Sequence, residues 1–171
     1  NSSATAVGTI LNDEGIRAVV RLQVADSSGV PLPVGTSLNP NDTFTLQAYV
    51  QDIGSTPRGI FQAFVDATYN SSLVALDGPI TFGPRFGNGQ QGNTSTPGLL
   101  DEVGAFGDLS APAQPGAEAL FFSVPFRVIG AGIATFGVDP ADVTDHDILV
   151  YLDSPSVVPP TAVNYAGTQL L

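Results

Sequence analysis

Three runs of the chain alternate apolar and polar side chains, as β-strands with one buried face do. The runs span residues 43–50, 59–69 and 118–129. The side chains expected to point inward are Phe44, Leu46, Ala48 and Val50 in the first run, Phe61, Ala63, Val65, Ala67 and Tyr69 in the second, and Leu120, Phe122, Val124, Phe126 and Val128 in the third. We expect these strands to supply most of the core.

The rest of the chain also consists of short strand-like runs separated by turn residues. Its 19 glycines and 14 prolines separate short runs rich in Val, Ile, Phe, Thr and Tyr. Further strands are expected at residues 5–11, 16–25, 73–76, 102–106, 132–138, 147–152 and 162–171. Residues 83–101 and 107–117 are rich in Gly, Pro and polar residues, and they are expected to be loops. Short strands at this spacing predict an all-β sandwich.

The outward face of the 59–69 strand carries the most informative side chains. It consists of Gln62, Phe64, Asp66 and Thr68, so a phenylalanine stands in a polar row. We expect this ring to be shielded from water, either by another part of the chain or by a binding partner. On the 118–129 strand, the outward set includes Phe121, Ser123 and Arg127, which would extend the same face if the two strands share a sheet.

Charge narrows the choice of partners. All five basic residues are arginine, and 16 carboxylates give a net charge of −11. A domain this acidic repels phosphate backbones, so we expect no nucleic-acid partner. No apolar run is long enough to cross a bilayer, so no membrane insertion is expected. The chain also lacks cysteine, which excludes disulfides and thiolate chemistry.

Three motifs, in order, resemble those of cohesin domains. They are the Asn39–Leu46 run, the strand and turn from Gly59-Ile60 through Tyr69-Asn70 to Leu73, and the strand pair within Gly116–Phe136. The resemblance covers about residues 17–152. It implies a jelly-roll β-sandwich of about nine strands that binds dockerin modules and tethers proteins into extracellular assemblies. Relatives of this family include carbohydrate-binding modules.

A second resemblance lies at the start of the chain. The run from Ala6 to Glu14 is similar to the closing strand of Calx-β repeats, which are modules of surface proteins. Residues 1–14 are therefore interpreted as the tail of a preceding repeat or as the first strand of this domain, with residues 15–171 forming the cohesin-like sandwich. We interpret the chain as a piece of a longer protein with extracellular or cell-surface modules.

Catalysis finds little support in the residue types. The single histidine, His146, lies between Asp145 and Asp147 in what is expected to be a solvated acidic loop. A nucleophilic triad would need this ring to be buried and oriented by a carboxylate. The chain is therefore not expected to be an enzyme.

Carboxylates close in sequence raise the question of calcium, which prefers hard oxygen ligands. Asp139, Asp142, Asp145 and Asp147 are the candidate ligands. The alternative is that they form a solvated loop without an ion, and no other cofactor is expected.

The sequence favours a non-catalytic docking module with a protein partner such as a dockerin-type module. Its binding face would be Gln62, Phe64, Asp66 and Thr68, extended by Phe121, Ser123 and Arg127. The alternative is a carbohydrate-binding module for polysaccharide, with or without the help of calcium, in which Tyr151 and Tyr165 are the candidate sugar platforms. A structural spacer is the third possibility, in which residues 1–14 or 83–101 cover Phe64.

Overall fold

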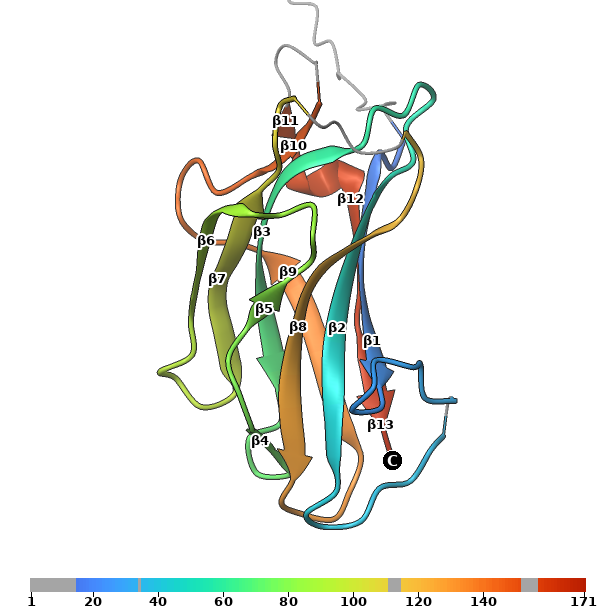
Figure 1. Ribbon diagram of the computed structural model, residues 1–171, viewed down its shortest axis with the longest axis vertical. Helices are drawn as coiled ribbons and strands as arrows, with labels where there is room; N and C mark the ends of the chain where they lie inside the picture. Colours follow the sequence, from blue (N-terminus) through green and yellow to red (C-terminus); the bar gives the residue numbers. More distant parts are fainter. Residues whose placement is uncertain (1–14, 34, 111–114, 152–156) are drawn as a thin grey trace, which may run out of the picture.

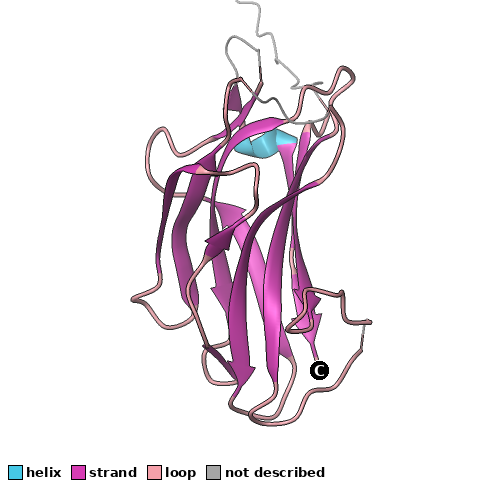
Figure 2. Cartoon of the chain, in the orientation of Figure 1, coloured by secondary structure: helices cyan, strands magenta, loops and turns pink. Residues whose placement is uncertain are grey.

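The computed structural model describes residues 15–33, 35–110, 115–151 and 157–171. Two β-sheets face each other across one apolar core (Figure 1). Strands dominate the described chain, and the short 3-10 helix η1, Pro160–Ala162, is the one helical element there (Figure 2). The predicted all-β sandwich is confirmed.

The first sheet, sheet A, has six strands. Its hydrogen-bonded order is β12-β1-β2-β8-β4, and β5 also pairs with β8. The strands of sheet A are β1 (Ala18–Ala25), β2 (Thr43–Asp52), β4 (Val74–Leu76), β5 (Thr81–Phe82), β8 (Ala119–Val128) and β12 (Val163–Ala166).

The second sheet, sheet B, has seven strands, with β3 at its centre. Its order is β11-β10-β3-β7-β6, and β9 pairs with both β3 and β13. The strands of sheet B are β3 (Ile60–Tyr69), β6 (Asn88–Asn93), β7 (Leu99–Phe106), β9 (Ala134–Pro140), β10 (Ile148–Val150), β11 (Val157–Val158) and β13 (Thr168–Leu170).

The end of the chain connects the two sheets. β12 pairs in parallel with β1 of sheet A, and β13 pairs antiparallel with β9 of sheet B. Gly167 lies between them, where a Cβ would approach the Phe136 carbonyl oxygen to 2.3 Å. A residue without a side chain is therefore needed at this crossing.

Aromatic rings from both sheets meet at the centre of the core. Phe126 of β8 stacks on Phe44 of β2 at 5.6 Å between ring centroids. It also makes edge contacts with Phe136 of β9 at 5.7 Å and Tyr69 of β3 at 5.0 Å. These are the favourable geometries for aromatic pairs, and they tie sheet A to sheet B.

The predicted strands agree with the structure along most of the described chain. The runs at 16–25, 43–50, 59–69, 73–76, 118–129 and 132–138 correspond to β1, β2, β3, β4, β8 and β9, while the run at 162–171 divides into β12 and β13. The expected strand at 5–11 lies outside the described residues.

The prediction that residues 83–101 form a loop is wrong, since β6 and the start of β7 lie within them. All six residues of β6 are exposed, so this strand at the sheet edge shows no apolar alternation. Its glycines make room for neighbours: a Cβ at Gly89 would lie 2.1 Å from the Phe106 ring, and one at Gly92 would lie 2.8 Å from Ile80.

One carboxylate organises the connection from sheet A to sheet B. Asp52, at the end of β2, is fully buried. One of its oxygens accepts the Gly54 amide at 3.0 Å, and the other accepts the amides of Arg58 at 2.7 Å and Gly59 at 3.2 Å. The turn that carries the chain into β3 therefore depends on both oxygens of Asp52.

Replacing Asp52 with asparagine tests this role. An amide has a single acceptor oxygen, so Asp52→Asn leaves at least one of these N–H groups without its partner, at a cost of about 1–3 kcal/mol. We expect this loss of unfolding free energy in urea denaturation. Asp26→Asn is the matched control, because one oxygen of Asp26 accepts both the Ser28 and Val30 amides. Equal stability of the two variants would contradict the role of Asp52.

Candidate functional site

The outward side chains of β3 define a row across the middle of sheet B. Gln62, Phe64, Asp66 and Thr68, called the β3 row below, alternate with Ala63, Val65 and Ala67, which lie in the core. Their environments differ. Thr68 is exposed and Gln62 partly exposed, whereas Phe64 and Asp66 are each only 7% exposed.

Phe64 is covered by the protein itself. On one side, its ring lies against Gly104 of β7, where an added Cβ would approach the ring to 1.7 Å. On the other side, the imidazole of His146 stacks on it, with 4.1 Å between ring centroids and 13° between ring planes. A phenylalanine in this polar row is thus explained by a glycine below the ring and a histidine above it.

His146 belongs to residues 141–147, the loop that links β9 to β10 and is called the 141–147 loop below. In Figure 1, this orange loop extends beside β6 and β7. Side chains of sheet B hold it at both ends. The Gln62 amide donates to the carbonyls of Asp147 at 3.2 Å and Asp145 at 3.4 Å. The Gln91 amide of β6 lies 3.2 Å from Nε2 of His146.

Glu102 of β7 makes the strongest attachment to this loop. Its Oε1 accepts the backbone amides of Asp142 at 2.7 Å and Val143 at 2.8 Å. Its Oε2 pairs with Nδ1 of His146. With its proton on Nδ1, the ring donates to Glu102 and accepts from Gln91, so both ring nitrogens have partners.

The backbone of Glu102 adopts a conformation unusual for its residue type. Its φ is +52°, in the left-handed region that glycine favours. The pairing of β7 with β3 shifts register here, because Val65 pairs with Val103 whereas Ala67 pairs with Leu100. This bulge directs the Glu102 amide to Asp66 at 2.7 Å and leaves its carboxylate free to reach the loop.

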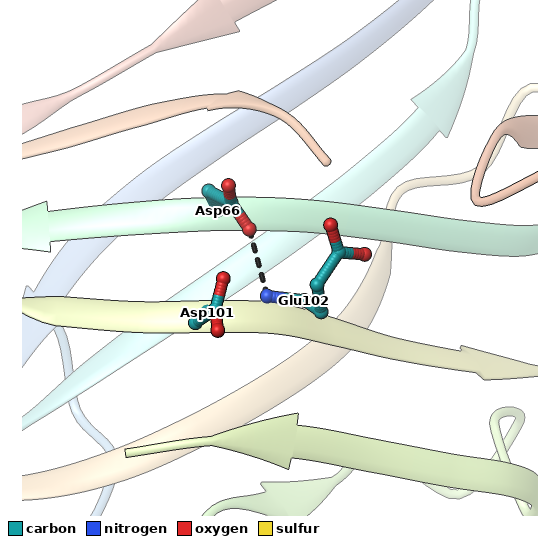
Figure 3. Close-up of side chains that lie close together, drawn as sticks. All are labelled: Asp66, Asp101 and Glu102. Carbon is teal, nitrogen blue, oxygen red and sulfur yellow. Dashed lines mark hydrogen bonds between the residues drawn. The ribbon is translucent and has the colours of Figure 1, made fainter. Parts of the chain in front are cut away.

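Three carboxylates converge beside this bulge. Ligand oxygens of Asp66, Asp101 and Glu102, called the acidic trio below, all lie within 4.8 Å of one another. Figure 3 shows them side by side on β3 and β7, with the bond from the Glu102 amide to Asp66. All three carboxylates already have hydrogen-bond partners, since Asp101 accepts from the Asn93 amide at 3.1 Å.

The trio affects the protonation of its members. Burial raises the pKa of Asp66, the Glu102 amide lowers it, and the charges of Glu102, Asp101 and Asp142 raise it; the net direction is upward. For Glu102, burial alone would raise the pKa. The hydrogen bonds from His146, Val143 and Asp142 outweigh burial, and the pKa lies below its ordinary value. The hydrogen bonds to Glu102 therefore favour its charged form.

The predicted calcium ligands do not converge. Among the described residues, the acidic trio is the one group of three or more close His, Cys or carboxylate ligands, and it contains none of Asp139, Asp142, Asp145 and Asp147. Asp139 lies opposite Asp66 on β9, while Asp142 and Asp145 are exposed in the loop. An ion at the trio would compete with the hydrogen bonds of Glu102. Calcium binding stays a prediction.

The extension of the face onto the 118–129 strand is wrong in its geometry. That strand is β8 of sheet A, so Phe121, Ser123 and Arg127 do not continue the β3 row. Phe121 is also fully buried, because a register shift opposite Ala48 and Tyr49 takes it out of the alternation. It packs against Phe82, Phe86 and Phe122. Ser123 contacts Thr81, and exposed Arg127 pairs with Asp77 at 3.4 Å.

The expectation of a solvated His146 is also wrong, since its side chain is only 23% exposed. Its carboxylate partner is Glu102, far away in sequence, instead of the adjacent aspartates. A hydrolytic triad would need a hydroxyl at the other ring nitrogen, where the described neighbour is the amide of Gln91.

The tyrosines considered as sugar platforms are largely withdrawn from the surface. Tyr151 is 3% exposed, with its ring on Phe61 and its hydroxyl donating to the Asp108 carbonyl at 3.2 Å. Tyr165 is partly buried in β12, and this burial raises its pKa to about 12. The Tyr151 ring therefore lacks the open flat face that stacking on a sugar requires.

Comparisons with known proteins identify the fold. No protein-family model matches the sequence, and no curated protein sequence matches it. The cohesin module of a family 33 glycoside hydrolase from Clostridium perfringens has a TM-score of 0.57 and 13% identity, with 91% of this chain and 96% of that one covered. The sixth cohesin of scaffoldin B from Acetivibrio cellulolyticus, solved with a Cel5 dockerin, has a TM-score of 0.56 and 15% identity, with 92% and 99% covered.

The cohesin CaCohA2 from Clostridium acetobutylicum has a TM-score of 0.54 and 17% identity, with 90% and 92% covered. Together with the topology, these matches place the chain among two-sheet β-sandwiches. Its fold is cohesin-like, as the sequence motifs predicted. Within the described residues, no helix is long and apolar enough to span a membrane.

Gly104→Ala tests whether the glycine is needed beneath Phe64. The added methyl group would overlap the ring, so the ring or β7 must move, and overpacking of this kind costs about 1–3 kcal/mol. We expect this loss in urea denaturation. Gly87→Ala is the control, since a Cβ there meets nothing within 4 Å. If Gly104→Ala is as stable as Gly87→Ala, Phe64 does not depend on the glycine.

Asp66→Asn tests the cost of a charge at position 66, to which burial contributes most and repulsion within the acidic trio adds. A raised folded-state pKa means that ionised Asp66 destabilises the fold at neutral pH and that this penalty disappears as pH falls through the folded pKa. Asparagine keeps an oxygen for the Glu102 amide and removes the charge. We expect a higher Tm than wild type at pH 7 and a smaller difference near pH 4.

The control for this variant is Asp108→Asn, because hydrogen bonds from Ser110 lower the pKa of Asp108. The loss of that charge should give no rise in Tm at pH 7. A Tm for Asp66→Asn at or below wild type at pH 7 would contradict this cost of the Asp66 charge.

Proposed function

We propose that this chain is a non-catalytic protein-docking module of an extracellular or cell-surface protein, and that its partner is a dockerin-type module. The observation that supports this most is the cohesin-like fold over about nine-tenths of the chain. The relative from Acetivibrio cellulolyticus was solved in complex with a dockerin.

The proposed binding surface is the outer face of sheet B. Polar and apolar groups alternate there over three strands: Leu149 of β10 and Phe106 of β7 both pair with Gln62, and all three are partly exposed. Thr68 supplies an exposed hydroxyl further along β3. Partly exposed aromatic and aliphatic groups in a polar frame are typical of protein interfaces.

The charge of this face indicates the chemistry of the partner. The acidic trio and Asp142 lie on or beside it, and His146 is the one basic side chain that pairs with any of them among the described residues. A partner with exposed arginine or lysine would complement this charge. Association should then weaken as salt increases, because screening reduces the attraction between exposed charges.

Binding of dockerin modules to the chain and two of its variants tests the proposal. We expect saturable binding of at least one dockerin, such as the Cel5 dockerin, in biolayer interferometry. Thr68→Arg places a long cation on the proposed face and should weaken binding about tenfold or more. Ser123→Arg is the matched control, since it makes a similar change on the outer face of sheet A and should bind as wild type does.

If Ser123→Arg weakens dockerin binding and Thr68→Arg leaves it unchanged, the interface lies on sheet A instead of sheet B. Binding to glycans on an array, with no dockerin bound at any salt concentration, would favour a polysaccharide ligand and overturn the proposal.

A further inference from the structure

The 141–147 loop lies across the proposed docking face and hides its most apolar side chain. Phe64 is 7% exposed because the His146 ring stacks on it. Phe64 is also the one aromatic residue of the β3 row. The position of the loop therefore determines whether this ring can contact a partner. The docking consequence of this inference rests on the proposed function, but the loop itself can be tested without any partner.

The attachments of the loop are polar and few. Asp142, Val143, Thr144 and Asp145 are all exposed, so little apolar surface of the loop is buried. Its central attachment is Glu102, which holds two amides and the His146 ring with one carboxylate. The bonds from Gln62 and Gln91 are longer, at 3.2 to 3.4 Å. Segments held by exposed polar contacts are those that open at the lowest free energy.

A carboxylate of the loop opposes the closed position. The charge of Asp142 is among those that raise the pKa of Asp66, so the loop brings a carboxylate towards the acidic trio. The hydrogen bonds of the Glu102 carboxylate offset this repulsion.

We propose that the 141–147 loop is a latch on the outer face of sheet B, closed by the Glu102 carboxylate and opened by a partner cation that replaces His146 on Glu102. Opening removes the imidazole from Phe64 and presents an apolar ring beside a carboxylate. The partner that fits the opened face carries an arginine or lysine next to an apolar side chain. Such a cation forms a charge-assisted bond with Glu102, which compensates for the loss of the His146 contact.

Glu102→Gly is the informative variant, because glycine accepts the left-handed backbone and lacks the carboxylate. Amide exchange by NMR should show Asp142 and Val143 exchanging on the order of tenfold faster or more, as expected for the loss of a charged hydrogen bond. The chain has a single histidine, so its ring signals are easily recognised, and their nuclear Overhauser contacts with Phe64 should disappear.

Asp145→Gly is the matched control. Asp145 also has a left-handed backbone, with a φ of +72°, but its side chain makes no hydrogen bond among the described residues. This variant should keep both the slow amides and the contact between His146 and Phe64. Retention of both signals in Glu102→Gly as well would overturn the latch.

A second pair of variants keeps the test decisive if Glu102→Gly does not fold. His146→Ala removes the ring that covers Phe64, whereas His146→Phe retains a flat ring without the bond to Glu102. Binding of an apolar dye should increase for His146→Ala and stay near the wild-type level for His146→Phe. Equal dye binding by wild type and both variants would mean that the loop does not hide Phe64.

Partner measurements separate this inference from the proposed function. With a dockerin that binds wild type, His146→Ala should associate faster, because opening no longer precedes docking. If His146→Ala associates no faster than wild type, the latch does not control docking. If no dockerin binds any variant, the proposed function fails, and amide exchange alone decides whether the latch exists.

Discussion

The outer face of sheet B depends on Glu102, whose backbone and side chain meet two separate requirements. Its amide reaches Asp66 because the bulge in β7 turns this residue into the left-handed region. Its carboxylate then reaches the amides of Asp142 and Val143 and the ring of His146. A glycine would satisfy the backbone alone. A side chain in this conformation costs about 1–2 kcal/mol, and the bonds to the loop offset that cost.

Alternation predicts the interior of this protein well and its edges poorly. β2 and β3 have one buried and one outward face, so their register could be predicted from the sequence. β6 is exposed along its whole length, and nothing in its Asn, Gly and Gln residues distinguishes it from a loop. Phe121 does not follow the alternation for another reason. It is the extra residue at a register shift between β2 and β8, and an extra residue reverses which face the residues on one side of it point to.

The candidate site could be predicted only in part, because its decisive contacts are distant in sequence. The β3 row and the question of what covers Phe64 could both be derived from alternation. The cover itself joins β3, β7 and a loop, through Gly104 and His146. No local signal marks Glu102 as left-handed or as the partner of a histidine 44 residues away. A prediction that paired β3 with β7 in register would have placed Gly104 opposite Phe64, which indicates that the ring lies over the glycine.

The closed latch has a consequence for the selectivity of docking. A partner that offers only apolar surface could cover Phe64, but Glu102 would lose a charged hydrogen bond, at a cost of about 1.5–3 kcal/mol. A partner that offers only a cation would satisfy Glu102 and leave the Phe64 ring in water, at a cost of about 1.5–3 kcal/mol. Only a partner that carries a cation and an apolar side chain at the right separation both bonds Glu102 and buries Phe64. The closed loop would therefore select against partners that offer only an apolar side chain or only a cation. Specificity arises here because a wrong partner loses an interaction that the free protein already makes.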